Sequence, residues 1–307
     1  MPEPGDLTTT TIGERNMSIF QRVAVLGFGT MGGGIAQVVA ASGRDVVVLE
    51  ADQARLDRGH EAVRRFLDGG VRRGKSTEVE RDAVLGRITG VTEVAALAGA
   101  DLVIEAVTER SDVKVDLLGR VADVVGEDAV LTTNTSALSV TDIAAHLPRP
   151  QRVAGLHFFN PAPVMALVEV VRALQTDVDV VADLVSFVEE IGKSPVEVKD
   201  RPGFLVNRLL MPYLNDVVQE YDAELATAED IDLAIQLGLG YKLGPLALLD
   251  LIGIDVHRHA TESAYEATLD PQFAPPPLLS QMVAAGYLGD KSGRGFRVGT
   301  KEQGEAR

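Results

Sequence analysis

The first half of the chain alternates short apolar runs with stretches whose apolar residues recur at helical spacing. The run RVAVL at residues 22–26 is rich in β-branched residues and is followed by glycines, which is typical of a buried strand. Strands that alternate with helices form βαβ units, and such units build a doubly wound sheet covered by helices. We therefore predict an α/β domain with strands at 22–26, 45–49, 101–107, 129–132 and 152–156, and helices at 31–41, 52–67 and 113–125.

The pattern changes near Pro202, where the strand-like runs stop. The segment Asp200-Arg201-Pro202-Gly203 interrupts the periodicity and marks a domain boundary. The rest of the chain predicts an all-α domain with helices at 206–221, 228–237, 246–261 and 278–285. We thus expect a polar, disordered leader over residues 1–19, an α/β domain over 20–200 and a helical domain over 201–307.

Composition narrows the class of protein. The 307 residues are 46% hydrophobic and 24% charged, as in an ordinary globular chain. No apolar run reaches the ~20 residues that a membrane-spanning helix needs, and a net charge of −16 argues against nucleic acid or anionic membrane as a partner. The absence of cysteine rules out disulfides and thiolate metal sites. We expect a cytoplasmic protein that uses no metal.

One basic cluster stands against this acidic background. It lies on the helix predicted over 52–67 and just beyond it, and consists of Arg64, Arg65, Arg72, Arg73 and Lys75. From charge alone, a solvated helix surface is the favoured interpretation, and an anion-binding patch is the alternative.

A glycine-rich motif follows the first strand directly. Residues 27–32 read GFGTMG, a G-x-G-x-x-G placed between a strand and a helix. In this context the first glycine allows a tight turn, the second lets the backbone approach a pyrophosphate, and the third lets the helix pack closely. The helix N-terminus offers N–H groups to the phosphates. We expect a Rossmann-type cofactor site formed by Gly27, Gly29, Thr30, Met31 and Gly32.

Glu50 ends the second strand, 18 residues after Gly32. A carboxylate at this place can bind the ribose hydroxyls and repels a 2′-phosphate, so we predict NAD rather than NADP. Arg44 and Arg55 lie nearby in the sequence and would favour NADP. The alternative for Glu50 is a strand-end carboxylate that faces water.

Hydride transfer to a nicotinamide requires the protein to move a proton at the reacting oxygen. Of the five histidines, His157 has the most suggestive setting, LHFFNP, whereas His257 and His259 are expected to flank a helix. Glu169 lies within the apolar run LVEVV, where a carboxylate needs a partner. If the chain reverses between them, Glu169 can orient the imidazole of His157. The spacing alone leaves open whether the two residues meet.

At this point the sequence resembles the 3-hydroxyacyl-CoA dehydrogenase family, in particular its bacterial 3-hydroxybutyryl-CoA branch. The resemblance runs from about residue 22 to residue 296. Its motifs are GFGTMGGGIAQ from Gly27, DLVIEAVTE from Asp101, NTSALSV from Asn134, HFFNPAPVMALVEVV from His157, RPGFLVNRLL from Arg201, GPLALLDLIGID from Gly244 and KSGRGF from Lys291.

The resemblance implies roles for particular residues. His157 matches the general base, Glu169 its carboxylate partner, Ser136 the serine that bonds the reacting oxygen, and Asn207 an asparagine that positions the substrate. The residues that match the nicotinamide end of the cofactor site are Glu109, Lys114 and Asn134. The family further implies an acyl-CoA substrate and a dimer formed by the helical domain. It also makes four residues of the basic cluster candidates for contacts with the CoA phosphates, namely Arg64, Arg72, Arg73 and Lys75.

Other functions are considered beside this one. A family member that acts on an acyl carrier protein would use the same chemistry and the same basic cluster. An L-gulonate-type sugar-acid 3-dehydrogenase shares the architecture but needs no CoA contacts. A catalytically silent NAD-binding sensor would need only the glycine loop and Glu50. Two departures from the family pattern, Lys242 and the sequence Phe296-Arg297-Val298, lie in the helical domain and bear on substrate or dimer contacts.

Overall fold

The computed structural model describes residues 19–297, so most of the expected leader lies outside the described residues. The α/β part begins with β1 (Arg22–Leu26), whose alternate side chains enter two different cores. Val23 and Val25 pack on one face of the sheet, and Ala24 and Leu26 on the other. A strand that is buried on both faces has to be apolar throughout, as this run is.

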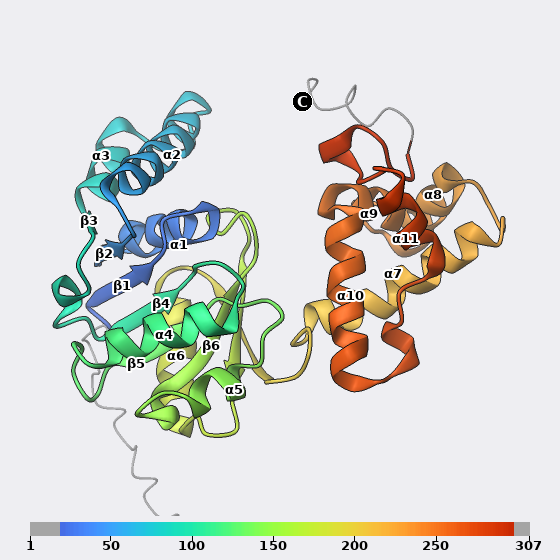
Figure 1. Cartoon of the computed structure of the whole chain (residues 1–307). Coiled ribbons are helices and arrows are strands. Elements are labelled where there is room, and N and C mark those ends of the chain that lie inside the picture. The colour runs from blue at the N-terminus through green and yellow to red at the C-terminus, as the bar shows by residue number, and fades with distance from the viewer. Residues whose placement is uncertain (1–18, 298–307) are drawn as a thin grey trace, which may run out of the picture.

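The sheet has eight strands in the order β3-β2-β1-β4-β5-β6-β7-β8. Helices α1, α2, α3 and α6 cover one face, and α4 and α5 cover the other (Figure 1). The strands are β1, β2 (Asp45–Leu49), β3 (Ile88–Val91), β4 (Leu102–Glu105), β5 (Val130–Thr133), β6 (Val153–Phe158), β7 (Leu167–Arg172) and β8 (Ser194–Lys199). The helices are α1 (Thr30–Ala41), α2 (Gln53–Arg72), α3 (Glu78–Gly86), α4 (Ser111–Ala122), α5 (Val140–Ala145) and α6 (Val178–Glu190).

The predicted doubly wound fold is confirmed, with three differences in detail. β3 and β8 form strands that the sequence pattern does not reveal, and both lie at edges of the sheet. Their burial is partial, so they lack the continuous apolar run of a central strand. β7 runs antiparallel to β6, whereas every other neighbouring pair is parallel.

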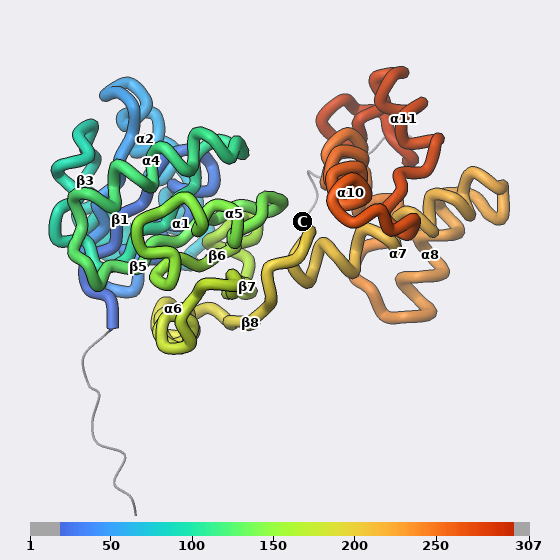
Figure 2. Tube along the Cα trace, turned by 60° about the horizontal axis from the view of Figure 1, so that its bottom comes forward, coloured from blue at the N-terminus to red at the C-terminus, as the bar shows by residue number. Residues whose placement is uncertain are grey.

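The helical part follows β8 and lies to one side of the sheet, joined to it by a single passage of chain (Figures 1 and 2). Its helices are α7 (Val206–Asp222), α8 (Ala228–Leu239), α9 (Pro245–Ile252), α10 (Ile254–Thr268) and α11 (Pro277–Ala284). They enclose a separate apolar core that includes Leu214, Leu249 and Leu279. None of the helices within residues 19–297 is long and apolar enough to cross a membrane.

The single helix predicted over 246–261 is wrong, because the chain breaks at Gly253. This glycine has φ +100°, a conformation that interrupts helical geometry and is strained for other residues. α9 ends before it and α10 begins after it. His257 therefore lies inside α10 rather than at a helix flank. It is buried there, and its Nε2 contacts Oδ1 of Asn215 at 3.1 Å.

Two buried aspartates hold the end of the described chain against the helical core. Asp250 accepts hydrogen bonds from the backbone N–H groups of Phe296 and Arg297, each at 2.9 Å. Asp232 accepts from the guanidinium of Arg297 at 2.8 Å. Burial raises the pKa of Asp250. Arg297, one of the departures from the family pattern, thus turns inward and neutralises Asp232.

Acid is expected to destabilise the protein through His257, because burial lowers the pKa of this imidazole to about 4. The unfolded chain takes up the proton near the ordinary value of 6.5. The stabilising contribution is therefore complete above pH 6.5 and is lost as the pH falls toward 4, by up to about 3 kcal/mol. Urea unfolding at a series of pH values measures this loss.

The matched variants for that measurement are His257→Gln and His146→Gln. Glutamine at position 257 keeps a nitrogen that can donate to Asn215, so the free energy of unfolding should depend less steeply on pH between 6.5 and 4. His146 lies on an exposed helix end, and its replacement should leave the slope unchanged. Equal slopes in wild type and His257→Gln would contradict the role of His257.

Candidate active site

The glycine loop between β1 and α1 has the geometry of a dinucleotide cradle. Gly27 has φ +94°, and a Cβ at Gly32 would lie 1.9 Å from the carbonyl oxygen of Gly27, so the backbone itself requires both glycines. A Cβ at Gly29 would meet no atom within 4 Å. Glycine at this position is therefore not needed for packing, and its lack of a side chain leaves room for a phosphate against the N-terminus of α1.

Thr30 and Met31 begin α1 directly after this loop. The helix has no side-chain cap at Gly29, so its first N–H groups suit an external anion. Met31 also lines a second cavity beside His157.

Glu50 lies beside the glycine loop, directly after β2. One of its carboxylate oxygens accepts from the N–H of Phe28 at 2.8 Å and the other from the N–H of Ala51 at 2.9 Å. Arg55 lies 3.9 Å from the same carboxylate and is mostly exposed. Arg44 is turned away from this site: its guanidinium contacts the carbonyl of Phe20 and pairs with Glu190.

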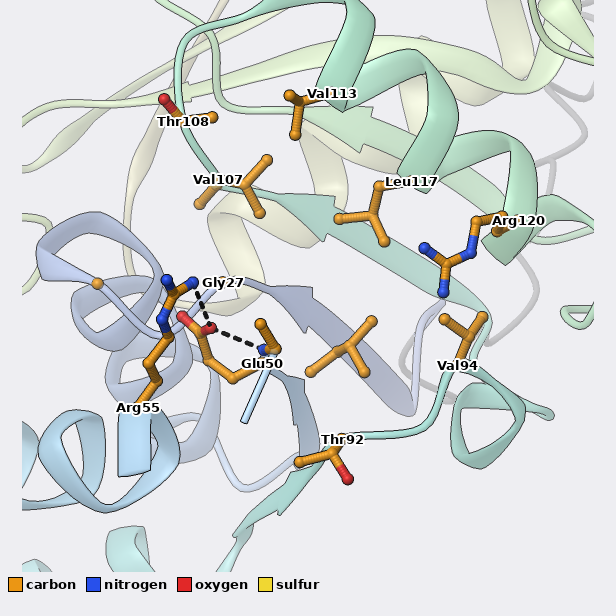
Figure 3. A pocket seen from close by; sticks show the side chains of 14 residues that line it. Gly27, Glu50, Arg55, Thr92, Val94, Val107, Thr108, Val113, Leu117 and Arg120 are labelled. Carbon is orange, nitrogen blue, oxygen red and sulfur yellow. Dashed lines mark hydrogen bonds and ion pairs between the residues drawn. The ribbon is translucent and has the colours of Figure 1, made fainter. Parts of the chain in front are cut away.

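A cavity of about 600 Å³ extends from the glycine loop over the ends of β1, β2 and β4. Figure 3 shows its walls, with Val107, Val113 and Leu117 on one side and Glu50 with Arg55 on the other. Such a cleft, outside the carboxyl ends of parallel strands, is where open α/β sheets bind their ligands. Its apolar walls suit an adenine ring, and its polar end suits a ribose.

His157 and Glu169 meet through strand pairing. β6 and β7 are antiparallel, and their register places the two residues directly opposite one another. The Nδ1 atom of His157 lies 2.7 Å from Oε2 of Glu169, and both side chains are buried. The aromatic rings of Phe159 and Phe204 pack against the imidazole at 4.6 and 5.5 Å between centroids.

The second oxygen of Glu169 holds the start of the helical part. Oε1 accepts the N–H groups of Leu205 at 3.1 Å and Val206 at 2.9 Å, where α7 begins. Burial raises the pKa of this carboxyl, but the contact with His157 and the two N–H bonds outweigh it, so the net pKa is lowered. Glu169 is therefore ionised at neutral pH and accepts a hydrogen bond from Nδ1–H of His157.

A second cavity of about 350 Å³ brings most of the predicted site residues together. It shares Ala106 and Val107 with the first cavity, so the two adjoin. Its polar lining comes from four segments far apart in the sequence, and the residues are Glu109, Lys114, Asn134, Ser136, His157, Asn160 and Asn207. Asn207 is contributed by α7 of the helical part, and the others by the sheet part.

Asn134 and Ser136 follow the carboxyl end of β5. Oδ1 of Asn134 accepts the N–H of Phe158 at 2.8 Å, which ties this loop to the strand carrying His157. The hydroxyl of Ser136 is exposed and lies 3.4 Å from Oε1 of Glu109.

Lys114 is buried between two carboxylates. Its ammonium group contacts Glu105 at 2.8 Å and Glu109 at 3.1 Å. Glu105 is fully buried at the end of β4, and the sequence patterns do not single it out as a site residue. The available signal was its place inside the apolar run DLVIEAV, the same signal that marks Glu169.

The remaining histidines lie outside this constellation. His60 stacks edge-on against Phe28, and His257 belongs to the buried network of α10. Within the described residues, no group of three or more histidines and carboxylates is placed to hold a metal ion.

Comparison with known proteins shows the family of the chain. A family model for the NAD-binding domain of 3-hydroxyacyl-CoA dehydrogenase matches residues 22–201, and one for the C-terminal domain of the same enzymes matches residues 203–298. The 3-hydroxybutyryl-CoA dehydrogenase of Mycobacterium tuberculosis is 45% identical over 278 residues, covering 90% of this chain and 97% of the relative. The 3-hydroxyadipyl-CoA dehydrogenase of Escherichia coli is 45% identical over 276 residues, covering 90% of this chain and 58% of that protein.

Among solved structures, the (S)-3-hydroxybutyryl-CoA dehydrogenase of Ralstonia eutropha superposes with a TM-score of 0.89 at 42% identity, covering 92% of this chain and all of that one. The NAD-binding family model confirms NAD as the predicted cofactor. With both domain models matched and relatives similar over nine-tenths of its length, the chain belongs to the 3-hydroxyacyl-CoA dehydrogenase family of NAD-dependent oxidoreductases.

Proposed function

We propose that this protein interconverts a short-chain 3-hydroxyacyl-CoA and its 3-oxoacyl-CoA partner, with His157 as the general base. The observation that carries the proposal is the buried contact between Nδ1 of His157 and the ionised carboxylate of Glu169, inside a cavity that adjoins the cofactor cleft. The named relatives act on thioesters of this class.

Bound NAD would supply the hydride acceptor for the oxidation, and its reduced form the hydride donor for the reduction. We propose that the adenosine and phosphates of NAD are held by Gly27, Gly29, Thr30, Met31, Gly32 and Glu50. The nicotinamide end would be held by Glu109, Lys114 and Asn134. A fixed Nδ1–H leaves Nε2 of His157 as the proton acceptor for the 3-hydroxyl group, and the resulting imidazolium is stabilised by Glu169.

Ser136 and Asn207 complete the proposed reaction site. The hydroxyl of Ser136 is suited to bond the reacting oxygen, and the amide of Asn207 to orient the thioester from the opposite domain. A small cavity of about 70 Å³ adjoins both residues and is lined by Met211 and by alanines of α10. Its size supports a short acyl chain.

The basic cluster is proposed to bind the phosphates of CoA. Arg64, Arg65, Arg72, Arg73 and Lys75 are all exposed on α2 and the turn after it. Because an acyl carrier protein also presents a phosphate and acidic groups, the same surface would suit that carrier. If the substrate were a sugar acid, the basic cluster would have no role. If the protein were a catalytically silent sensor, the contact between His157 and Glu169 would have no role.

We predict that purified protein oxidises NADH in the presence of acetoacetyl-CoA, followed by absorbance at 340 nm. His157→Ala removes the proton donor for the reduction, so kcat should fall by roughly 10²–10⁴-fold. His146→Ala serves as the matched control, since His146 is exposed and remote from both cavities. Absence of turnover in wild type that still binds NADH would favour a carrier-protein or sugar-acid substrate, and then a sensor.

We predict that Glu50 rather than a lack of positive charge limits the use of NADPH. Glu50→Ser removes the carboxylate that repels a 2′-phosphate and leaves Arg55 beside it, so kcat/KM for NADPH relative to NADH should rise at least about tenfold. The double variant Glu50→Ser/Arg55→Ala should lose this gain. If Glu50→Ser leaves the ratio unchanged, Glu50 does not set cofactor choice.

We also propose a homodimer formed through the helical domain, and a cytoplasmic location. Large apolar side chains are exposed on α8, on α9 and on the segment between them, namely Leu233, Leu237, Leu239, Tyr241, Leu243 and Leu251. Apolar side chains gathered in this way are typical of a protein interface. The intact chain has a mass of 32.7 kDa, so light scattering should give twice this value.

Charge on that surface should break the dimer. We expect Leu237→Lys/Leu251→Lys to elute as a monomer, because the interface would have to bury two unpaired ammonium groups. The control is Leu174→Lys, an equally exposed leucine of the sheet domain, which should stay dimeric. A dimer that survives the double substitution would place the interface elsewhere.

A further inference from the structure

Two linked ion pairs, Glu105 with Lys114 and Lys114 with Glu109, connect the interior of the sheet to the second cavity, where Ser136 lies. We propose that Glu105 is a positioning residue: acting through Lys114 and Glu109, it holds the loop and hydroxyl of Ser136 in place. This inference rests on the proposed function, because that function gives the Ser136 hydroxyl its role at the reacting oxygen.

The inner link of the chain is the bond between Glu105 and Lys114. Both oxygens of Glu105 contact the ammonium group, at 2.8 and 3.0 Å, and neither side chain is more than 1% exposed. The oxygens also accept the N–H of Val107 at 2.6 Å and the hydroxyl of Thr133 at 2.7 Å. A buried pair is firm only when its other hydrogen bonds are satisfied, as they are here. The ammonium group of Lys114 is therefore held in one position.

The middle link is the ion pair between Lys114 and Glu109. The ammonium group lies 3.1 Å from Oε2 of Glu109. Burial raises the pKa of Glu109, but the charge of Lys114 and bonds from Thr135 and Ser136 outweigh it, so the net pKa is lowered. Glu109 is therefore a carboxylate at neutral pH, with one oxygen turned toward Lys114 and the other toward the loop.

The outer link consists of several hydrogen bonds that Oε1 of Glu109 accepts from the loop after β5. This atom accepts the hydroxyl of Thr135 at 2.6 Å and the N–H groups of Ser136 at 2.9 Å and Ala137 at 3.3 Å. The Ser136 hydroxyl lies 3.4 Å away. Because Ser136 is exposed, packing does not hold its side chain. Its position depends on the carboxylate.

Glu105 is important to the position of Ser136 because it holds the ammonium group of Lys114 in place. Without its negative charge, the buried ammonium group would have Glu109 as its one remaining carboxylate contact, and that side chain is 41% exposed and can move. A shift of Glu109 toward Lys114 would withdraw Oε1 from the loop. The alternative is that Glu105 serves stability alone by joining β4 to α4.

A double-mutant cycle separates these two roles. We expect Glu105→Gln to lower kcat with acetoacetyl-CoA at saturating NADH by roughly 10- to 100-fold, the effect of losing one charge-assisted contact. In a Ser136→Ala background the same change should lower kcat by less than about twofold, because the hydroxyl that it positions is absent. A loss of kcat that multiplies fully in the double variant would overturn the proposal, since a purely structural role acts independently of the hydroxyl.

A second measurement does not depend on activity. Amide hydrogen exchange in the free protein should accelerate at Ser136 and Ala137 in Glu105→Gln, because Glu109 releases their N–H groups. The amides of Leu205 and Val206 are held in the same way by Glu169 and serve as internal controls. Unchanged exchange at Ser136 and Ala137 would overturn the positioning role. If wild type turned over no thioester, the proposed function would fail while this test still stood.

A variant at the outer link tests the proposal even if Glu105→Gln does not fold. Thr135→Val keeps the shape of the side chain and leaves Glu105 and Lys114 untouched, but it removes the 2.6 Å bond to Glu109 and the 2.9 Å bond that the hydroxyl accepts from the N–H of Leu138. It should lower kcat in wild type and leave kcat unchanged in Ser136→Ala. Thr132→Val is the matched control: it removes a buried 2.8 Å bond to the carbonyl of Val103, outside the chain of ion pairs. Equal losses of kcat in the two valine variants would overturn the proposal.

Discussion

A carboxylate buried in the middle of a sheet must find partners for both of its oxygens, and the way Glu169 does so organises this molecule. One oxygen faces the imidazole of His157 across a strand pair, and the other accepts the first N–H groups of α7. The same side chain therefore orients the candidate base and anchors the helix that carries Asn207. Because the carboxylate is saturated by these contacts, it stays ionised without exposure to water.

Glu105 repeats this arrangement in the same sheet, three strands away from Glu169. Unlike Glu169, it ends its strand, but it is likewise buried with partners on both oxygens, and it pairs with Lys114, which in turn pairs with Glu109. Both carboxylates lie in the stretch of sheet from β4 to β7, which opens into the cavity beside the cofactor cleft. In both cases a buried carboxylate of the sheet contacts a side chain that lines the second cavity.

Features that depend on residues close together in the sequence could be predicted, whereas features that depend on contacts between distant segments could not. The glycine loop and Glu50 follow one strand and end the next, so their spacing alone placed them in one cleft. The central strands were visible because both faces are buried, whereas β3 and β8 are edge strands with mixed burial. His157 and Glu169 could be suspected but not joined, since their contact requires the antiparallel register of β7. Glu105 and the break at Gly253 depend on tertiary contacts and backbone conformation, which periodicity does not encode.

The two domains meet at the second cavity through the first turn of α7, a continuous helix that contains Pro212. Leu205 and Val206 are bonded to Glu169, and Phe204 packs its ring on His157, so the turn that carries Asn207 belongs mechanically to the sheet. Beyond Pro212, Leu214 and Val218 belong to the helical core. Proline supplies no N–H to the preceding turn. α7 therefore lacks one backbone hydrogen bond between the turn that carries Asn207 and the turns that pack in the helical core.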